Sequence, residues 1–300
     1  MPVIMHKTIT PRQVAMKKRP ETREEKMINS LSPMLNLMVK SVRRAASSLH
    51  RDFHEVAHLQ LSKKGPGDFV SSADLMVEKK LIALLQEAKP DFGILSEECG
   101  KIAPKNDSPY CWVIDPIDGT TNFIHAIPTF AVSLALMRGD EVLDAVVYNP
   151  ILNELYYAEK GQGAFVMRPT GDERLRVSAR RSIETTVVSL NPAFLVNHPQ
   201  ISDSFLKDNA AIRMNGSTTL ALASVASGQS DVFMESRTHL WDIATGYLLV
   251  KEAGGIVQTW SGKTTLKDIM QEETFLATTM DLRDEVVKKL PKVKKNLKKK

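Results

Sequence analysis

The sequence predicts a protein of the α/β class, an α+β sandwich, and three features of its 300 residues support this. Apolar residues recur at helical spacing across residues 33–58. Strand-like segments separated by short turns follow across residues 130–167. Strand and helix patterns then alternate from residue 187 to residue 290, as in α/β proteins.

The first predicted helix spans residues 33–58. Ser32 followed by Pro33 is typical of a helix start, because Ser caps the first turn and Pro is tolerated inside it. A loop is expected at Ser62–Asp68, which contains Gly and Pro, and a second helix from about Ala73 to Ala88.

Strands are predicted in the middle of the chain. Phe92–Leu95 and residues 110–114 are short apolar runs, and the second ends abruptly at Asp115-Pro116. Successive hairpins should then form an antiparallel sheet. Its strands are expected at Phe130–Met137, Val142–Tyr148, Leu155–Glu159 and Gly163–Met167.

The last third alternates between strands and helices, and a subdomain boundary is expected near residues 168–180. The strands are predicted at Val187–Leu190, Ile212–Asn215, Asp231–Glu235, Ile256–Thr259 and Phe275–Thr279. The helices are predicted at Thr218–Ser227, Leu240–Ala253 and Leu282–Leu290. The folded domain, residues 27–287, thus divides into subdomains of about 27–175 and 176–287.

The net charge of +5 is unevenly distributed. Residues 1–26 carry a net charge of +4 and are expected to be a disordered extension. Residues 288–300 contain eight lysines and no acid. The body, residues 27–287, therefore has a net charge of −7, which favours cations over nucleic acid as its partner. The lysine-rich end is interpreted as a solvated tail, with weak RNA or anionic-lipid contact as the alternative.

Composition also excludes a membrane protein. The longest apolar runs fall well short of the ~18 residues that span a bilayer, and the first residues lack the apolar segment of a secretory signal. Two cysteines cannot build a disulfide framework, so we expect a cytoplasmic protein.

The most informative segment is Asp115-Pro116-Ile117-Asp118-Gly119-Thr120-Thr121. Two acids at the end of a buried strand repel each other unless a cation lies between them. Gly119 permits a tight turn, and the threonines could cap a helix whose free N–H groups bind phosphate. An ordinary turn that caps a helix is the alternative interpretation.

Two further acidic segments favour the site interpretation. Glu97-Glu98 follows a probable strand, where a solvated turn is the alternative. Asp242, beside Trp241, stands at the start of an apolar helix, where a helix cap is the alternative.

In order and spacing these three segments resemble the inositol monophosphatase family, of the superfamily that includes fructose-1,6-bisphosphatase. Gly67–Asp74 and Gly216-Ser217 also match, and the resemblance covers roughly residues 33–285. It departs at Ser96, where many members have Gly. The resemblance implies a layered αβαβα fold, a Mg²⁺-dependent and lithium-sensitive phosphatase, and a homodimer.

The resemblance also implies the metal ligands, for two to three Mg²⁺ ions. Glu97, Asp115 and the Ile117 carbonyl would hold the first ion, and Asp115, Asp118 and Asp242 the second. A third would lie near Glu97. Oxygen ligands suit Mg²⁺.

Catalytic roles follow from the same resemblance. A metal-activated water, held by Glu97 and Thr120, would attack phosphorus in line, with Asp74 supporting Thr120. The backbone N–H groups of Gly119 and Thr120 would bind the phosphate.

Glu235, Gly216 and Ser217 would contact the substrate, which we expect to be inositol 1-phosphate or a similar small sugar or polyol phosphate. The same chemistry on fructose 1,6-bisphosphate, histidinol phosphate or an adenosine bisphosphate is an alternative. A different alternative is a binding protein for RNA or a transcription complex, with secondary phosphatase activity.

Overall fold

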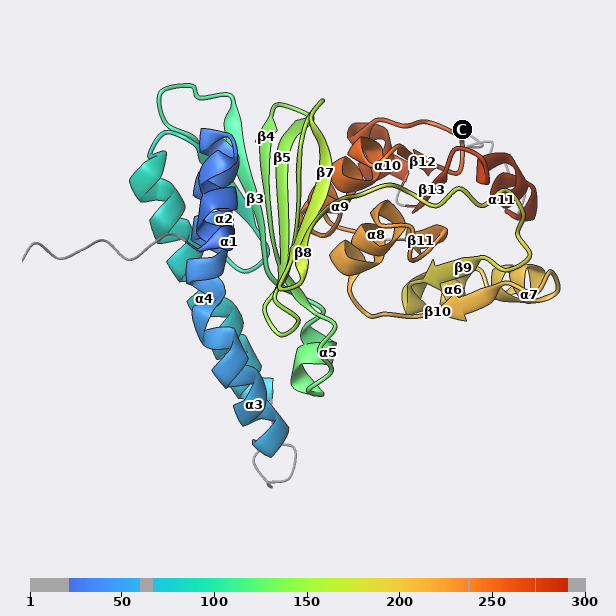
Figure 1. Cartoon of the computed structure of the whole chain (residues 1–300), viewed down its shortest axis with the longest axis horizontal. Helices are drawn as coiled ribbons and strands as arrows, with labels where there is room; N and C mark the ends of the chain where they lie inside the picture. The colour runs from blue at the N-terminus through green and yellow to red at the C-terminus, as the bar shows by residue number, and fades with distance from the viewer. Residues whose placement is uncertain (1–21, 60–66, 237, 273, 291–300) are drawn as a thin grey trace, which may run out of the picture.

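The computed structural model describes residues 22–59, 67–236, 238–272 and 274–290. These residues form five layers, helix–sheet–helix–sheet–helix, from left to right in Figure 1. Three hydrophobic cores fill the spaces on either side of the two sheets. The predicted α/β class and αβαβα layering are therefore confirmed.

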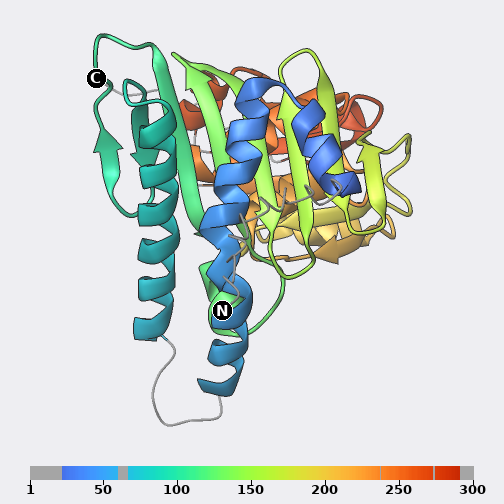
Figure 2. The same cartoon turned by 60° about the vertical axis from the view of Figure 1, so that its left-hand side comes forward.

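The outer helical layer comes from the first ninety residues. It contains α1 (Arg23–Ser30), α2 (Pro33–Ala45), a 3₁₀ turn (Ala46–Ser48), α3 (Leu49–Leu59) and α4 (Gly67–Ala88). Figure 2 shows α2 beside α4 on one face of the large sheet, with α3 continuing past the ends of the strands, where it contacts α5 (Thr120–Ile124). The predicted helix over 33–58 is thus interrupted by the 3₁₀ turn, and the second helix begins at Gly67 and not near Ala73.

Both ends of the folded domain extend slightly beyond the predicted bounds of 27–287. The last residues of the expected 1–26 extension, Arg23–Lys26, are the first turn of α1, which Thr22 caps. Lys288 and Lys289, assigned to the tail, lie in α11 (Arg283–Lys289). Residues 1–21, 291–300 and most of the expected loop at Ser62–Asp68 lie outside the described residues.

In the described chain, eight strands form the large sheet A in the order β2-β1-β3-β4-β5-β6-β7-β8. The sheet is antiparallel from β3 to β8, as the hairpins predict, whereas β1 pairs with β3 in parallel. The strands are β1 (Gly93–Ser96), β2 (Gly100–Ile102), β3 (Tyr110–Asp118), β4 (Ala131–Arg138), β5 (Glu141–Asn149), β6 (Glu154–Glu159), β7 (Gly163–Arg168) and β8 (Gly171–Arg174).

Two of these strands correct the sequence-based boundaries. The strand predicted to end at residue 114 continues to Asp118, with a register shift between Asp115 and Asp118. The segment Arg168–Asp172, expected to interrupt the sheet pattern, is the turn that adds β8 to it. Sheet A therefore ends at Arg174, within the range of 168–180 where the subdomain boundary was expected.

The central layer consists of α8 (Thr218–Ala226), α9 (Leu240–Glu252) and α10 (Leu266–Glu272). α9 packs on β3 to β7 of sheet A and on β12 of the second sheet, so it is apolar on all sides. α8 and α9 approach closely because Gly246 has no side chain: a Cβ there would lie 2.3 Å from Leu222 Cδ1.

The second sheet, sheet B, has the order β10-β9-β11-β13-β12 over the described residues. Its strands are β9 (Val187–Leu190), β10 (Ala211–Arg213), β11 (Val232–Ser236), β12 (Gly255–Thr259) and β13 (Thr274–Thr279). The fifth layer is α6 (Pro192–Asn197), α7 (Gln200–Leu206) and α11. Within the described residues, no helix has both the length and the apolarity needed to cross a bilayer.

Candidate active site

The first group of acids lies where β1 ends. Glu97 follows the last residue of β1, and its backbone N–H donates to the Ile114 carbonyl of β3 at 3.3 Å. This extra hydrogen bond continues the parallel pairing of the two strands. It brings Glu97 beside Asp115, the next residue of β3, so that the charge of each carboxyl group acts on the other.

The turn after Glu97 is held by Glu78, a buried residue of α4. The Glu78 carboxylate accepts a hydrogen bond from the Ser96 hydroxyl and from the backbone N–H groups of Glu98 and Cys99, the last two at 3.2 and 3.1 Å. Sequence reasoning missed Glu78. The available signal was an acid one residue after Val77 on the apolar side of a predicted helix, which needs partners when buried.

The second group of acids lies at the end of β3. Gly119 adopts φ of +94° and ends the strand, after which α5 (Thr120–Ile124) begins. The expected cap by Thr120 or Thr121 is wrong, because Gly119 occupies the cap position and the Thr120 hydroxyl donates back to the Ile117 carbonyl at 3.1 Å. That carbonyl oxygen keeps a second lone pair.

Asp118 is fixed by the N-terminus of α8. Its carboxylate accepts hydrogen bonds from the backbone N–H groups of Thr218 and Thr219, at 3.2 and 2.8 Å, and from the Ser217 and Thr219 hydroxyls. Free N–H groups at a helix start favour a negative charge. Asp118 thus joins sheet A to the central helical layer.

Asn122 and two glycines close this junction. The Asn122 amide donates to the carbonyls of Thr129 and Asn215, at 2.6 and 2.8 Å. A Cβ on Gly216 would lie 2.9 Å from Asn122 Nδ2, and a Cβ on Gly119 would lie 3.2 Å from the Gly216 carbonyl oxygen. The segments around Gly119 and Gly216 can therefore approach this closely only because both residues lack a side chain. Sequence reasoning missed Asn122, although it directly follows the Asp-Gly-Thr-Thr segment.

Asp242 lies in the first turn of α9. Its Oδ2 accepts the His239 backbone N–H at 2.7 Å and the Thr238 hydroxyl at 3.2 Å. Asp242 therefore caps the helix, as the alternative interpretation expected. Its charge also interacts unfavourably with the carboxyl groups of Glu97, Asp115 and Asp118.

The acids of the cluster lie close together and repel one another when charged. Burial raises the pKa of Asp115 well above its ordinary value, and the charges of Asp118, Glu97 and Asp242 raise it further. Burial also raises the pKa values of Glu97, Asp118 and Asp242. Asp115 Oδ1 is buried without a hydrogen-bond partner among the described atoms. A buried, unpartnered carboxylate oxygen among other carboxylates is an arrangement that a hard cation stabilises.

The oxygens are close together but not already arranged as a metal cluster. Among the described residues, no group of three or more His, Cys, Asp or Glu side chains has the arrangement of a metal site. Asp118 and Asp242 each turn an oxygen toward backbone N–H groups at the start of a helix. The oxygen-only donor set and the unpartnered Asp115 oxygen fit a divalent cation.

Asp74, on α4 one turn before Glu78, faces the same turn of the chain. It is 5 % exposed. Burial raises its pKa to about 8, and the charges of Glu98, Glu97 and Glu78 add to the shift. The predicted catalytic residue Asp74 therefore lies beside the predicted ligand Glu97.

Glu235, near the end of β11, lies beside Thr218, the first residue of α8. Its carboxylate accepts the Thr218 hydroxyl at 2.7 Å and the Asn191 side-chain amide. Burial raises its pKa to about 8, against the lowering effect of the Thr218 hydrogen bond. Through Thr218, the predicted substrate residue Glu235 is linked to Asp118. Asn191, just before α6, was not predicted from the sequence.

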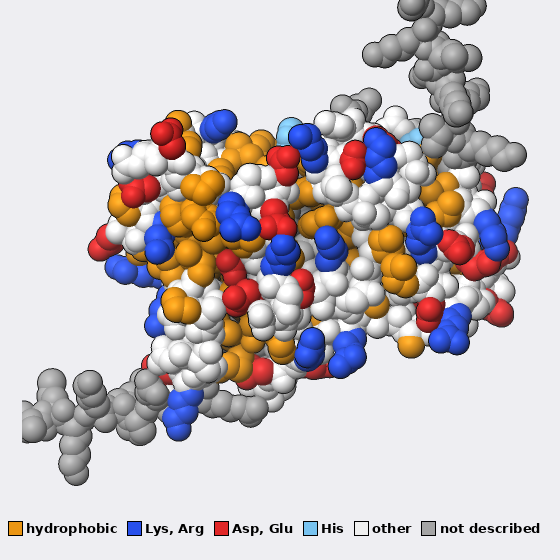
Figure 3. Space-filling view, turned by 90° about the horizontal axis from the view of Figure 1, so that it is seen from above, with side chains coloured by type: hydrophobic (Ala, Val, Ile, Leu, Met, Phe, Trp, Pro, Cys, Tyr) orange, Lys and Arg blue, Asp and Glu red, His pale blue; other side chains and the backbone are white. Residues whose placement is uncertain are grey.

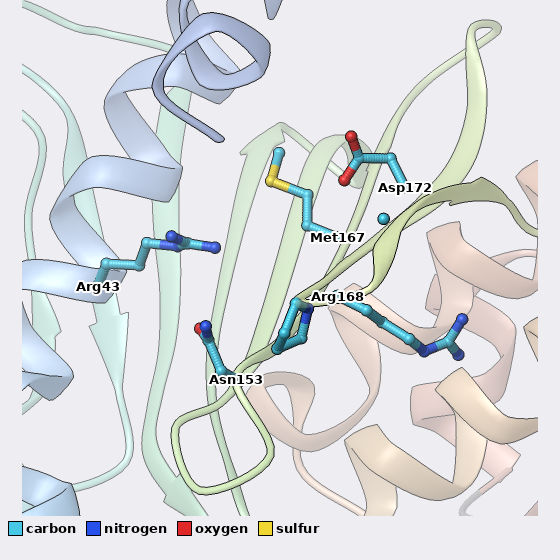
Figure 4. A pocket seen from close by; sticks show the side chains of 7 residues that line it. Arg43, Asn153, Met167, Arg168 and Asp172 are labelled. Carbon is cyan, nitrogen blue, oxygen red and sulfur yellow. The ribbon is translucent and has the colours of Figure 1, made fainter. Parts of the chain in front are cut away.

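A separate cavity lies at the far edge of sheet A. Figure 4 shows it between α2 and the β7–β8 hairpin, with Arg43 reaching toward Met167 and Asp172. Glu97 directly follows β1 and Asp115 lies in β3, toward the opposite edge of the sheet. We therefore place the candidate site at the carboxylate cluster and not in this cavity.

Comparison with known proteins gives the class of this protein, a phosphatase. The family model for the inositol monophosphatase family matches residues 30–295. The chain belongs to this family, which confirms the resemblance seen in the sequence.

Its relatives carry two kinds of name. The chain is 41% identical over 263 residues to an inositol-1-monophosphatase of Caulobacter vibrioides, covering 84% of this chain and 99% of the relative. It is 37% identical over 237 residues to the Nus factor SuhB of Escherichia coli, covering 77% of this chain and 87% of the relative.

A solved structure shares the fold at similar identity. The extragenic suppressor protein suhB of Bartonella henselae superposes with a TM-score of 0.77 at 40% identity, covering 87% of this chain and all of that one. The inositol monophosphatase of Anabaena gives a TM-score of 0.70 at 26% identity, covering 89% and 96% of the two chains.

Proposed function

We propose that this phosphatase is Mg²⁺-dependent and hydrolyses inositol 1-phosphate or a similar small sugar or polyol phosphate monoester. The observation that carries the proposal is Asp115 Oδ1, buried and unpartnered beside Glu97, Asp118 and Asp242. Glu97, Asp115, the Ile117 carbonyl, Asp118 and Asp242 would hold two to three ions. A bound Mg²⁺ would supply charge neutralisation and activation of water.

The chain's own groups would hold the phosphate. The backbone N–H groups of Gly119 and Thr120 stand at the start of α5, where N–H groups lack helical partners and favour an anion. The left-handed backbone of Gly119 is what turns them away from β3.

Asp74 would take part in proton transfer. A carboxyl group with a pKa near 8 lies close enough to neutrality to gain and lose a proton during turnover. Its place on α4, beside Glu97, suits a role in supporting Thr120 and receiving the proton of the attacking water.

Glu235 would orient the leaving group. A carboxylate accepts two hydroxyl hydrogen bonds, which suits a polyol. Asn191 and Thr218 fix the orientation of Glu235, and Gly216 and Ser217 directly precede Thr218 at the start of α8. Small residues at this position leave room for a ring.

A phosphate-release assay tests the proposal. Inositol 1-phosphate, fructose 1,6-bisphosphate, histidinol phosphate and an adenosine bisphosphate are compared while Mg²⁺ is titrated. We expect turnover of the inositol ester that depends on Mg²⁺ and is inhibited by millimolar Li⁺. Turnover that survives removal of divalent cations would contradict the metal assignment, and preference for another ester would change the substrate.

A second candidate function rests on the relatives named Nus factor SuhB. We propose that the chain makes weak RNA contact through its lysine-rich end. On the face in Figure 3, Lys and Arg (blue) alternate with Asp and Glu (red) and form no basic stripe. Removing residues 291–300 leaves α11 intact. This truncation should abolish salt-sensitive RNA binding and leave phosphate release unchanged; RNA binding that persists would contradict the assignment to the tail.

The same family resemblance leads us to propose a homodimer. Light scattering at micromolar concentration tests this, and a monomer would contradict it.

A further inference from the structure

An apolar cavity of about 390 Å³ lies beside the candidate site, between sheet A and the helices α9 and α10. Its volume falls in the range of small-molecule pockets, roughly 300–1,000 Å³. Six of its twelve lining residues are large and apolar: Leu95, Val113, Met137, Leu240, Leu266 and Met270. Asp140 and Gln271 are among the polar ones. Water gains few hydrogen bonds in such a space, so an apolar group is favoured there.

The cavity is connected to the carboxylate cluster by the chain itself. Leu95, Val113 and Leu240 each stand two residues before a predicted metal ligand: Glu97, Asp115 and Asp242, respectively. In a strand, residues two apart lie on the same face, so Val113 and Asp115 are neighbours along β3. A molecule that fills the cavity therefore touches the segments that position the cluster.

The rim of the cavity is positively charged. Lys101, on β2, lines it and forms no ion pair among the described residues, whereas Lys267 pairs with Asp140 at 3.3 Å. Lys101 acts electrostatically on the Cys111 thiol in the lining, where burial raises the thiol pKa and Lys101 lowers it. One uncompensated cation at the mouth of an apolar cavity complements an anionic head group.

We propose that this cavity binds a small amphipathic anion, with an aliphatic or aromatic body and one acidic group, and that its occupancy lowers turnover at the carboxylate cluster. The binding part stands on the cavity alone, and the effect on turnover rests on the proposed function. The body contacts Leu95, Val113 and Leu240, while the acidic group pairs with Lys101.

Fluorescence of anilinonaphthalene sulfonate tests the binding part. We expect one probe per chain, displaced by decanoate and less well by decanol. Met270→Trp fills the cavity and should weaken probe binding about tenfold or more. Met280→Trp is the matched control, because Met280 is 60% exposed outside the cavity, and it should bind as the unmodified protein does. Thermal unfolding checks that both variants fold.

The head-group contact has its own variants. Lys101→Gln should weaken decanoate binding severalfold without changing decanol binding, whereas the same change at exposed Lys105 should alter neither. Equal displacement by decanoate and decanol, or equal probe binding by Met270→Trp and Met280→Trp, would overturn the proposal. A third outcome is that Met270→Trp leaves probe binding unaltered but changes the oligomeric state measured by light scattering. That outcome would also overturn the proposal, because it would show that the cavity is an interface between two copies of the chain.

The effect on turnover is measured with p-nitrophenyl phosphate at saturating decanoate. We expect a severalfold fall in kcat that Met270→Trp abolishes. Unchanged turnover at full occupancy would overturn the coupling but not the binding site. Absence of any phosphatase activity would instead refute the proposed function, while the fluorescence experiment would still decide the cavity.

Discussion

The carboxylate of Asp118 accepts the backbone N–H of Thr219 at 2.8 Å, although 101 residues separate the two along the chain. Asp118 ends a strand of sheet A, and Thr219 lies in the first turn of α8. One carboxylate therefore satisfies the start of a central helix while standing in the cluster that we propose holds Mg²⁺.

Replacing Asp118 with Ala should destabilise the protein by about 1–3 kcal/mol, because two N–H groups and two hydroxyls lose their buried acceptor. Urea unfolding measures this, with exposed Glu87→Ala on α4 as the control. A change no larger than that of the control would show that water replaces the carboxylate without cost.

Asp115→Asn should separate activity from stability. We expect turnover to fall about 100-fold or more, because the central carboxylate of the cluster is removed. The pKa of Asp115 is raised in the folded state, so ionising this carboxyl near neutral pH opposes folding, and the neutral amide should raise Tm at pH 7. Steady-state kinetics and thermal unfolding measure the two effects. Retained turnover would contradict the metal assignment.

Glu78 should act by positioning Glu97. Glu78→Gln keeps an oxygen that accepts the N–H groups of Glu98 and Cys99, and Glu78→Ala removes it. We expect Glu78→Ala to raise the Mg²⁺ concentration at half-maximal turnover and to weaken Mg²⁺ binding by calorimetry, each about tenfold. Glu78→Gln should restore most of both. The control is exposed Glu87→Ala on the same helix, and equal effects of all three variants would argue against the positioning role.

The sequence predicted the acids of the proposed site but not the residues that support them. The acids stood out because carboxylates beside buried apolar runs are unusual. Glu78, Asn122 and Asn191 were missed because their importance depends on partners 7 to 93 residues away, and no local pattern encodes those contacts.

The fold shows the same division between local and distant effects. Periodicity located most strands and helices to within a few residues. It did not detect the 3₁₀ turn at Ala46–Ser48, whose flanking residues continue one apolar stripe. It also missed β8, which is polar because it forms an edge of the sheet.

Gly216→Ala should lower both stability and turnover, and Gly139→Ala is the control that separates the two effects. Gly216 has φ of +72° and a Cβ there would lie 2.9 Å from Asn122 Nδ2, whereas Gly139 has φ of +60° and open space around it. Both alanine variants carry the backbone strain of about 1–2 kcal/mol, but only Gly216→Ala should also lose turnover. Equal turnover in the two variants would show that Asn122 moves aside freely.

Asp144 should make stability depend on pH. Burial raises its pKa to about 7, and Glu159, directly opposite it on β6, adds to the shift. The folded carboxyl holds its proton more tightly than the unfolded one, so its effect should reduce stability as pH rises from about 4 to about 7. Asp144→Asn should remove this decline and raise the free energy of unfolding at pH 8 by at least about 1 kcal/mol. Urea unfolding of the unmodified protein and of Asp144→Asn at pH 4.5 and pH 8 measures this difference. If the free energy of unfolding changes with pH equally in the two proteins, Asp144 is not the group responsible.

The bond from Asp118 to α8 also bears on how the enzyme is made. Synthesis proceeds from the amino terminus, so Asp115 and Asp118 leave the ribosome about a hundred residues before Thr219 does. A nascent chain that stops short of α8 and α9 holds its acids without Asp242 or the helix start that orders Asp118. The proposed metal site would therefore be complete only once α9 has been made, and products truncated before α9 should be inert as phosphatases.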